Sequence, residues 1–140
     1  MAKEDNFSPE EREAMRERAR EFRAARAQAK KDPLGDLMSK IEEMSPADKK
    51  IALRIHELVT KTAPHLEPKT WYGMPAYAKN GKVVCFFQAS GKFKVRYSTF
   101  GFQEDALLDD GTFWSTTWAL TALTPQVEKQ IVQLVKKAAG

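Results

Sequence analysis

The sequence predicts an α+β protein: an antiparallel sheet of about four to five strands packed by N- and C-terminal helices. Two observations lead to this prediction. A hydroxyl residue precedes a proline at Ser8-Pro9, Ser45-Pro46 and Thr124-Pro125, and this pair is typical of a helix start. Between the second and third of these starts, aromatic and β-branched residues gather in short runs separated by glycine turns, which is typical of strands. The 140 residues, of which 42% are apolar and 30% charged, suffice for one globular domain.

Residues 1–32 are predicted to form an Arg/Glu-rich helical extension, followed by the α+β domain over residues 33–140. The helix of the extension is expected over residues 9–29. Its apolar stripe is thin, so it can bury little surface. Asp32-Pro33-Leu34-Gly35 then interrupts the helical pattern and marks the boundary.

Three further helices are expected in the domain. A short one covers residues 36–43. The next begins at Pro46 and ends before Pro64, with apolar residues such as Ile51 and Ile55 at helical spacing. The last begins at Pro125 and continues almost to the C-terminus, with lysines in its final turn that suit the helix dipole.

Four strands are predicted, over residues 70–79, 82–88, 92–99 and 113–121. Asn80-Gly81 joins the first two in the strongest short hairpin signal that a sequence offers, and Ser90-Gly91 is expected to join the next two. Residues 102–108 are predicted to be a short helix or a turn.

The most distinctive segment is Trp71-Tyr72-Gly73-Met74-Pro75-Ala76-Tyr77. Together with the glycine-turned hairpin after it and the basic run from Lys92 to Tyr97, it resembles the YdhG-like family of short bacterial domains, over roughly residues 44–139. The resemblance implies an antiparallel sheet packed by helices. Because one member of that family is regarded as a frataxin-like iron chaperone, the resemblance also implies intracellular iron binding or delivery. It implies no catalytic residue.

One acidic cluster in the domain could supply the oxygen ligands that iron accepts: Glu104, Asp105, Asp109 and Asp110. The alternative is a solvated turn, since Asp-Asp-Gly is ordinary turn chemistry. No other cofactor is indicated.

An organic small molecule is the second candidate ligand. Aromatic side chains with an adaptable methionine could line a pocket, and the alternative is that they fill the core. The candidate residues are Trp71, Tyr72, Met74, Tyr77, Trp114 and Trp118.

Weak nucleic-acid binding is the third candidate function. The net charge is +4, and the predicted strand 92–99 places Lys92, Lys94 and Arg96 on one face, where they could contact phosphates. The N-terminal helix adds arginines, but glutamates are interleaved with them, which favours a solvated helix over a nucleic-acid site.

Reaction chemistry is not indicated by any motif. Cys85, the only cysteine, shares a predicted strand face with Val83 and Phe87, so we expect a buried, inert thiol. The sequence has no phosphate-binding glycine loop and no HExxH motif. We therefore expect a non-enzymatic binding or accessory protein. Because no apolar targeting or membrane segment is visible, we also expect it to be cytoplasmic, and to be a monomer or a weak dimer.

Overall fold

The computed structural model describes residues 8–140, without the side chains of residue 22 and residues 24–31. The chain divides into two compact units, Met1–Asp32 and Pro33–Gly140. In the first, helix α1 (Pro9–Lys31) begins at Ser8, whose Oγ accepts a hydrogen bond of 3.2 Å from the Glu11 N–H. Met15, on the apolar stripe of α1, is 52% exposed.

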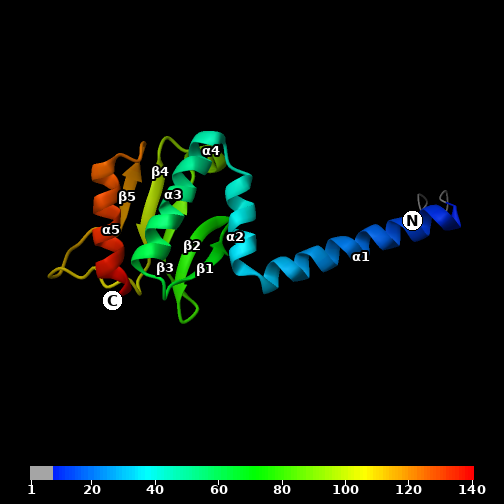
Figure 1. Cartoon of the computed structure of the whole chain (residues 1–140), viewed down its shortest axis with the longest axis horizontal. Coiled ribbons are helices and arrows are strands. Elements are labelled where there is room, and N and C mark those ends of the chain that lie inside the picture. The colour runs from blue at the N-terminus through cyan, green and yellow to red at the C-terminus, as the bar shows by residue number, and fades with distance from the viewer. Residues whose placement is uncertain (1–7) are drawn as a thin grey trace. The chain divides into compact units, whose positions relative to one another are not determined.

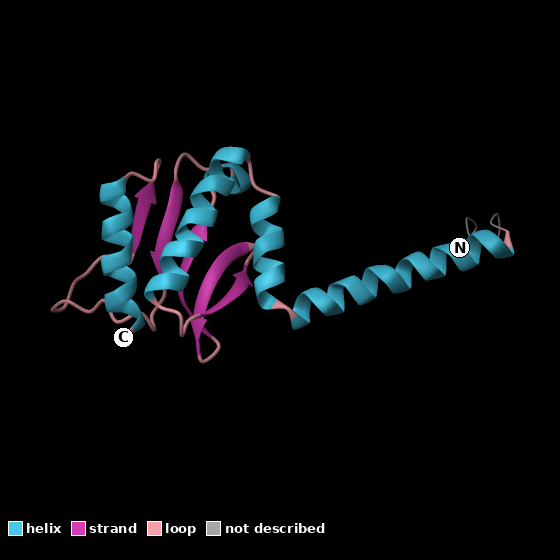
Figure 2. Cartoon of the chain, in the orientation of Figure 1, coloured by secondary structure: helices cyan, strands magenta, loops and turns pink. Residues whose placement is uncertain are grey.

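The second unit is the α+β domain, and its sheet has five strands, all neighbours antiparallel, in the order β1-β2-β3-β4-β5 (Figures 1 and 2). The predicted fold class is therefore confirmed. The strands are β1 (Glu67–Trp71), β2 (Met74–Lys79), β3 (Lys82–Gln88), β4 (Ser98–Phe102) and β5 (Thr117–Leu120). The helices are α2 (Pro33–Glu42), α3 (Pro46–Thr62), α4 (Ser90–Phe93) and α5 (Pro125–Ala139).

The hydroxyl–proline pairs begin helices as the sequence predicts. The Ser45 side chain accepts a hydrogen bond from the Asp48 N–H, and the Thr124 side chain accepts one from the Val127 N–H. The prolines that follow stand where a helix leaves its N–H groups unpaired, so their missing donor costs nothing.

Two tight turns shape the first part of the sheet. Asn80 and Gly81 have φ of 54° and 81° between β2 and β3, which is the predicted hairpin turn. Tyr72 and Gly73 have φ of 51° and 74°, so the same kind of turn divides the predicted strand 70–79 into β1 and β2. The prediction of one strand there was therefore wrong. The sequence did not indicate the turn because tyrosine rarely occupies a turn position with positive φ.

The predicted strand 92–99 was also wrong. Ser90–Phe93 forms the short helix α4, Lys94 is left-handed with φ of 54°, and the strand begins only at Ser98. Side chains from other parts of the chain accept hydrogen bonds from the backbone N–H groups of Ser90 and Gly91. Asp48 Oδ2 lies 3.0 Å from the Gly91 nitrogen, and Ser98 Oγ lies 3.0 Å from the Ser90 nitrogen. The basic residues that follow therefore do not line a strand face. The predicted strand 113–121 is likewise reduced to the four residues of β5.

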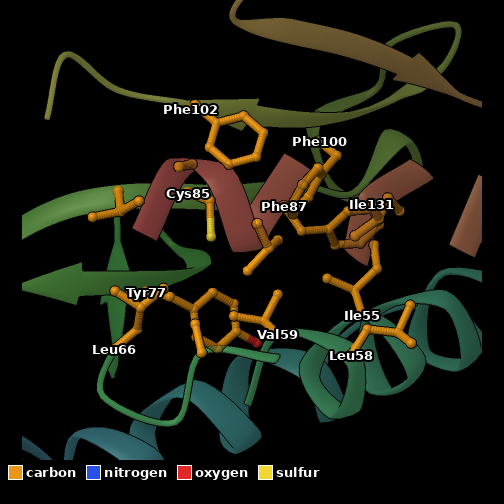
Figure 3. Packing of buried hydrophobic residues seen from close by; sticks show 14 of the residues in the cluster. Ile55, Leu58, Val59, Leu66, Tyr77, Cys85, Phe87, Phe100, Phe102 and Ile131 are labelled. Atoms are coloured by element: carbon orange, nitrogen blue, oxygen red, sulfur yellow. The ribbon is translucent and has the colours of Figure 1, made fainter. Parts of the chain in front are cut away.

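The main apolar core lies between the sheet and helices α2, α3 and α5. In Figure 3, Tyr77 and Phe87 from the sheet meet Val59 and Ile55 from α3. Phe87 is fully buried, and its cross-strand partner Phe100 is 2% exposed.

A smaller apolar cluster occupies the other face of the sheet, around Met74, Ala76, Val83 and Phe86, with Trp71 and Phe93 packed against it. The Phe86 ring crosses over Gly101 of β4 so closely that a Cβ at that glycine would lie 2.5 Å from Cζ. Glycine at position 101 therefore makes room for this ring.

Candidate functional site

A hollow of about 590 Å³ opens beside the connection between β4 and β5. Residues 103–116 of that connection supply most of its walls. The lining residues are Phe102, Gln103, Glu104, Ala106, Leu108, Asp109, Thr112, Phe113, Trp114 and Thr116. A volume of this size suits a small organic ligand.

The connection is fixed to the domain at several points. The Phe102 N–H donates to the Thr116 carbonyl (2.8 Å) where the connection leaves and rejoins the sheet. The Leu107 N–H donates to the Ala138 carbonyl of α5 (3.0 Å), while Ala106 and Leu108 are buried. The hollow is therefore bounded by anchored backbone, although the segment has no helix or strand of its own.

Two aromatic side chains at the hollow are unusually exposed. Phe113 is 94% exposed and Trp114 is 38% exposed. Leaving a phenylalanine in water forgoes about 1.5–3 kcal/mol of burial free energy. Phe113 and Trp114 are therefore available to a ligand or partner.

Two carboxylates line the same hollow as these rings. Glu104 and Asp109 line the same hollow and are exposed. Aromatic faces and carboxylates both attract cations, so the lining fits an organic cation such as an ammonium or guanidinium group. Sequence reasoning placed the four acids and Trp114 in two separate candidate sites, and the fold brings two of the acids, Glu104 and Asp109, to the same hollow as Trp114.

The four acids proposed as iron ligands do not all meet. Asp105 lines a different hollow of about 360 Å³, together with Lys79 and Lys82, and Asp110 lines neither of these two hollows. Among the described residues, no group of three or more His, Cys, Asp or Glu side chains is placed to hold a metal ion. The acidic cluster is therefore not a preassembled iron site.

The six residues proposed for an aromatic pocket do not share one pocket. Trp114 lines the hollow described above, whereas Trp118 lines a groove of about 460 Å³ between β5 and α5. Tyr77 lies in the main core, and Trp71, Tyr72 and Met74 lie at the turn between β1 and β2. The antiparallel register places that turn at one end of the sheet and Trp114 at the other. The sequence could not show this separation, because it depends on the strand order.

The turn between β1 and β2 presents a second aromatic surface. Tyr72 is 79% exposed and contacts Trp71 edge to face, with ring centroids 4.9 Å apart. Trp71 in turn lies against Phe86 at 5.3 Å. Lys92 Nζ donates to the Gly73 carbonyl at 2.9 Å and so holds the turn against α4.

The basic residues proposed for nucleic acid are all exposed, but they point to different surroundings. Lys92 Nζ donates a hydrogen bond to the Gly73 carbonyl and forms an ion pair with Glu43, whose carboxylate lies 3.6 Å away. Lys94 has the left-handed backbone described above, and the Arg96 guanidinium lies 5.2 Å from the Tyr97 ring. No shared strand face aligns them. In the N-terminal helix, the side chains of residues 24–31 lie outside the described part.

Cys85 and Tyr77 are buried in the main core, and the half-buried His56 lies against Tyr77. Cys85 has no exposed surface, as predicted, and burial raises the pKa of its thiol, so the thiol stays protonated. His56 Nδ1 lies 2.9 Å from the Tyr77 hydroxyl. Burial lowers the pKa of His56 and raises the pKa of Tyr77, so both are neutral at pH 7.

Sequence reasoning missed Phe113 and the pair of His56 and Tyr77. Phe113 lies two residues after the turn Asp109-Asp110-Gly111, and an aromatic residue so close to a turn could have indicated an exposed ring. No spacing in the sequence indicates that His56 and Tyr77 meet, since they are 21 residues apart.

Comparison of the chain with protein-family models, with curated proteins and with solved structures gave no match. Within the part of the chain that the structure describes, no helix combines the length and the apolar character needed to cross a membrane.

Proposed function

We propose that this chain is a non-enzymatic binding protein whose hollow beside the β4–β5 connection receives an organic cation. One observation carries the proposal. Phe113 and Trp114 are exposed in the same hollow that Glu104 and Asp109 line. A carboxylate supplies charge, and an aromatic face adds about 0.5–2 kcal/mol for a cation placed over it.

A pair of matched compounds tests this proposal. Choline should change Trp fluorescence and shift the NMR resonances of residues 103–116, whereas its uncharged tert-butyl analogue should bind weakly or not at all. Equal binding of the two compounds would show that the hollow recognises shape and not charge, and the proposal would fail.

Charge-neutralising variants locate the site. Glu104→Gln or Asp109→Asn should weaken choline binding about 1.5- to 5-fold, which corresponds to roughly 0.2–1 kcal/mol for an exposed charge pair. Asp110→Asn is the matched control, because Asp110 is exposed nearby but does not line the hollow. If Asp110→Asn weakened binding as much as Asp109→Asn, the effect would be one of overall charge.

Iron binding or delivery of the YdhG-like type is the alternative. It is supported by the resemblance of residues 44–139 to that family and by the four acids in the β4–β5 connection. Anaerobic titration with ferrous iron separates it from the first proposal. Iron bound through the acids should be lost when Glu104, Asp105, Asp109 and Asp110 are replaced by their amides, and it should be insensitive to Phe113→Ala. Iron binding that survives the four amide substitutions would rule out these acids as the ligands.

A further inference from the structure

The two outer strands of the sheet, β1 and β5, differ in which backbone groups they leave unpaired. In an antiparallel pair, successive residues turn their N–H and C=O groups alternately toward and away from the neighbouring strand. The Phe102 N–H donates to the Thr116 carbonyl, so Trp118 and Leu120, at steps of two residues, also face β4. The backbone groups of Thr117 and Ala119 therefore point outward from the edge of the sheet.

The β1 edge carries features that block pairing with another strand. Trp71 and Met74 flank the two-residue turn and face each other, so the alternation turns Pro68 and Thr70 outward. Pro68 has no N–H to offer, and the charged Glu67 and Lys69 flank it. Helix α2 packs against this strand as well. Proline, charge and a covering helix are the usual means by which proteins protect a sheet edge.

The β5 edge has none of these features. Its sequence is Thr117-Trp118-Ala119-Leu120, and no charged residue occurs anywhere from Gly111 to Val127. Thr117 and Ala119 are exposed. An uncharged edge with free donors and acceptors is a template for another strand.

An apolar groove continues this edge onto α5. It has a volume of about 460 Å³, and Trp118, Val127 and Leu134 form part of its walls while remaining only half-buried. Gln130, Gln133 and Lys137 supply its polar rim. An exposed backbone edge and an apolar surface therefore lie side by side.

We propose that β5 pairs antiparallel with β5 of a second copy of this chain across a two-fold axis, so that the sheet continues from one subunit into the other. A strand edge that presents alternating donors and acceptors is complementary to its own antiparallel copy, as a two-fold interface requires. The net charge of +4 opposes association of two copies in general, but β5 and its flanking residues from 111 to 127 carry no charge that would repel their own copy across the axis. Because β5 has only four residues, the dimer is weak and reversible.

Sedimentation equilibrium of the full chain from micromolar to millimolar concentration tests the association, and hydrogen exchange tests the surface. A monomer–dimer equilibrium is expected. The amides of Thr117 and Ala119 should gain protection as concentration rises, whereas those of Trp118 and Leu120 should already be protected by β4 in the monomer. Association without the gain at Thr117 and Ala119 would place the interface elsewhere and overturn the proposal.

A matched pair of lysine substitutions provides the second test. Ala119→Lys brings like charges together at the interface and should weaken dimerisation at least about tenfold. Ala122→Lys adds the same charge at an exposed position beyond the end of β5 and should leave dimerisation unchanged. Thermal unfolding of both variants verifies that they are folded. Equal weakening by both variants, or a chain that stays monomeric up to millimolar concentration, contradicts the proposal.

Discussion

The two faces of the sheet carry apolar clusters that differ in what packs on them. The main cluster lies under three helices, and its residues Phe87 and Cys85 have no exposed surface. The small cluster receives one residue, Phe93, from the four-residue helix α4, and its edge is formed by the half-buried Trp71. The main cluster therefore supplies most of the free energy of folding. The exposed side chains that are available for binding belong to turns and connections.

The largest effect is expected in the main cluster. Phe87→Ala should lower the free energy of unfolding by about 3–5 kcal/mol, because the ring is fully buried and a cavity remains. Denaturant unfolding followed by circular dichroism would measure the loss. A loss below about 1 kcal/mol would mean that the core collapses around the deletion.

Trp71→Ala in the small cluster should cost less, about 1–3 kcal/mol, since part of the ring is already in water. The variant removes the contacts with Phe86 and Tyr72. The same unfolding experiment measures it. A loss as large as that of Phe87→Ala would show that the two clusters are equally important and would remove the contrast between the faces.

The pair of His56 and Tyr77 predicts how stability depends on pH. Burial lowers the pKa of His56 below the 6.5 of the unfolded chain, and the charge of Glu57 opposes this more weakly. The unfolded state therefore takes up a proton first as pH falls through 6.5, and stability is lost down to the folded pKa. Above the unfolded value the contribution of His56 is complete.

Chemical denaturation between about pH 7 and about pH 5 would measure this slope. His56→Asn should flatten the slope in this range, and NMR titration of the His56 ring in the folded protein should give a pKa below 6.5. An unchanged slope in the variant would assign the pH dependence to other groups.

The smallest effect is expected at the tip of the β1–β2 hairpin. Tyr72 has φ of 51° and an exposed side chain, a conformation that asparagine adopts with less strain. Tyr72→Asn should therefore raise the free energy of unfolding by roughly 0.5–1 kcal/mol. A loss of stability would mean that the edge-to-face contact with Trp71 outweighs the backbone strain. Asn80, which occupies the equivalent position in the next hairpin, provides the internal comparison.

The sequence determined the parts of this protein that depend on local chemistry. The caps at Ser45 and Thr124 and the turn at Asn80-Gly81 are where the sequence placed them, because each depends on side chains within three residues. Helical spacing likewise predicted an apolar face on α3, where Ile55 is buried.

Tertiary structure alone decided which of the candidate residues meet. The alternation of basic and apolar residues predicted a strand over residues 92–99. However, Asp48 and Ser98 accept hydrogen bonds from the N–H groups of Gly91 and Ser90 and so favour a helical turn. Glu104 and Trp114, ten residues apart, line one hollow, while Trp71 and Trp114 lie at opposite ends of the sheet. The physical reason is that local propensity acts over a few residues, whereas the lining of a site depends on strand order, on register and on acceptors from distant segments.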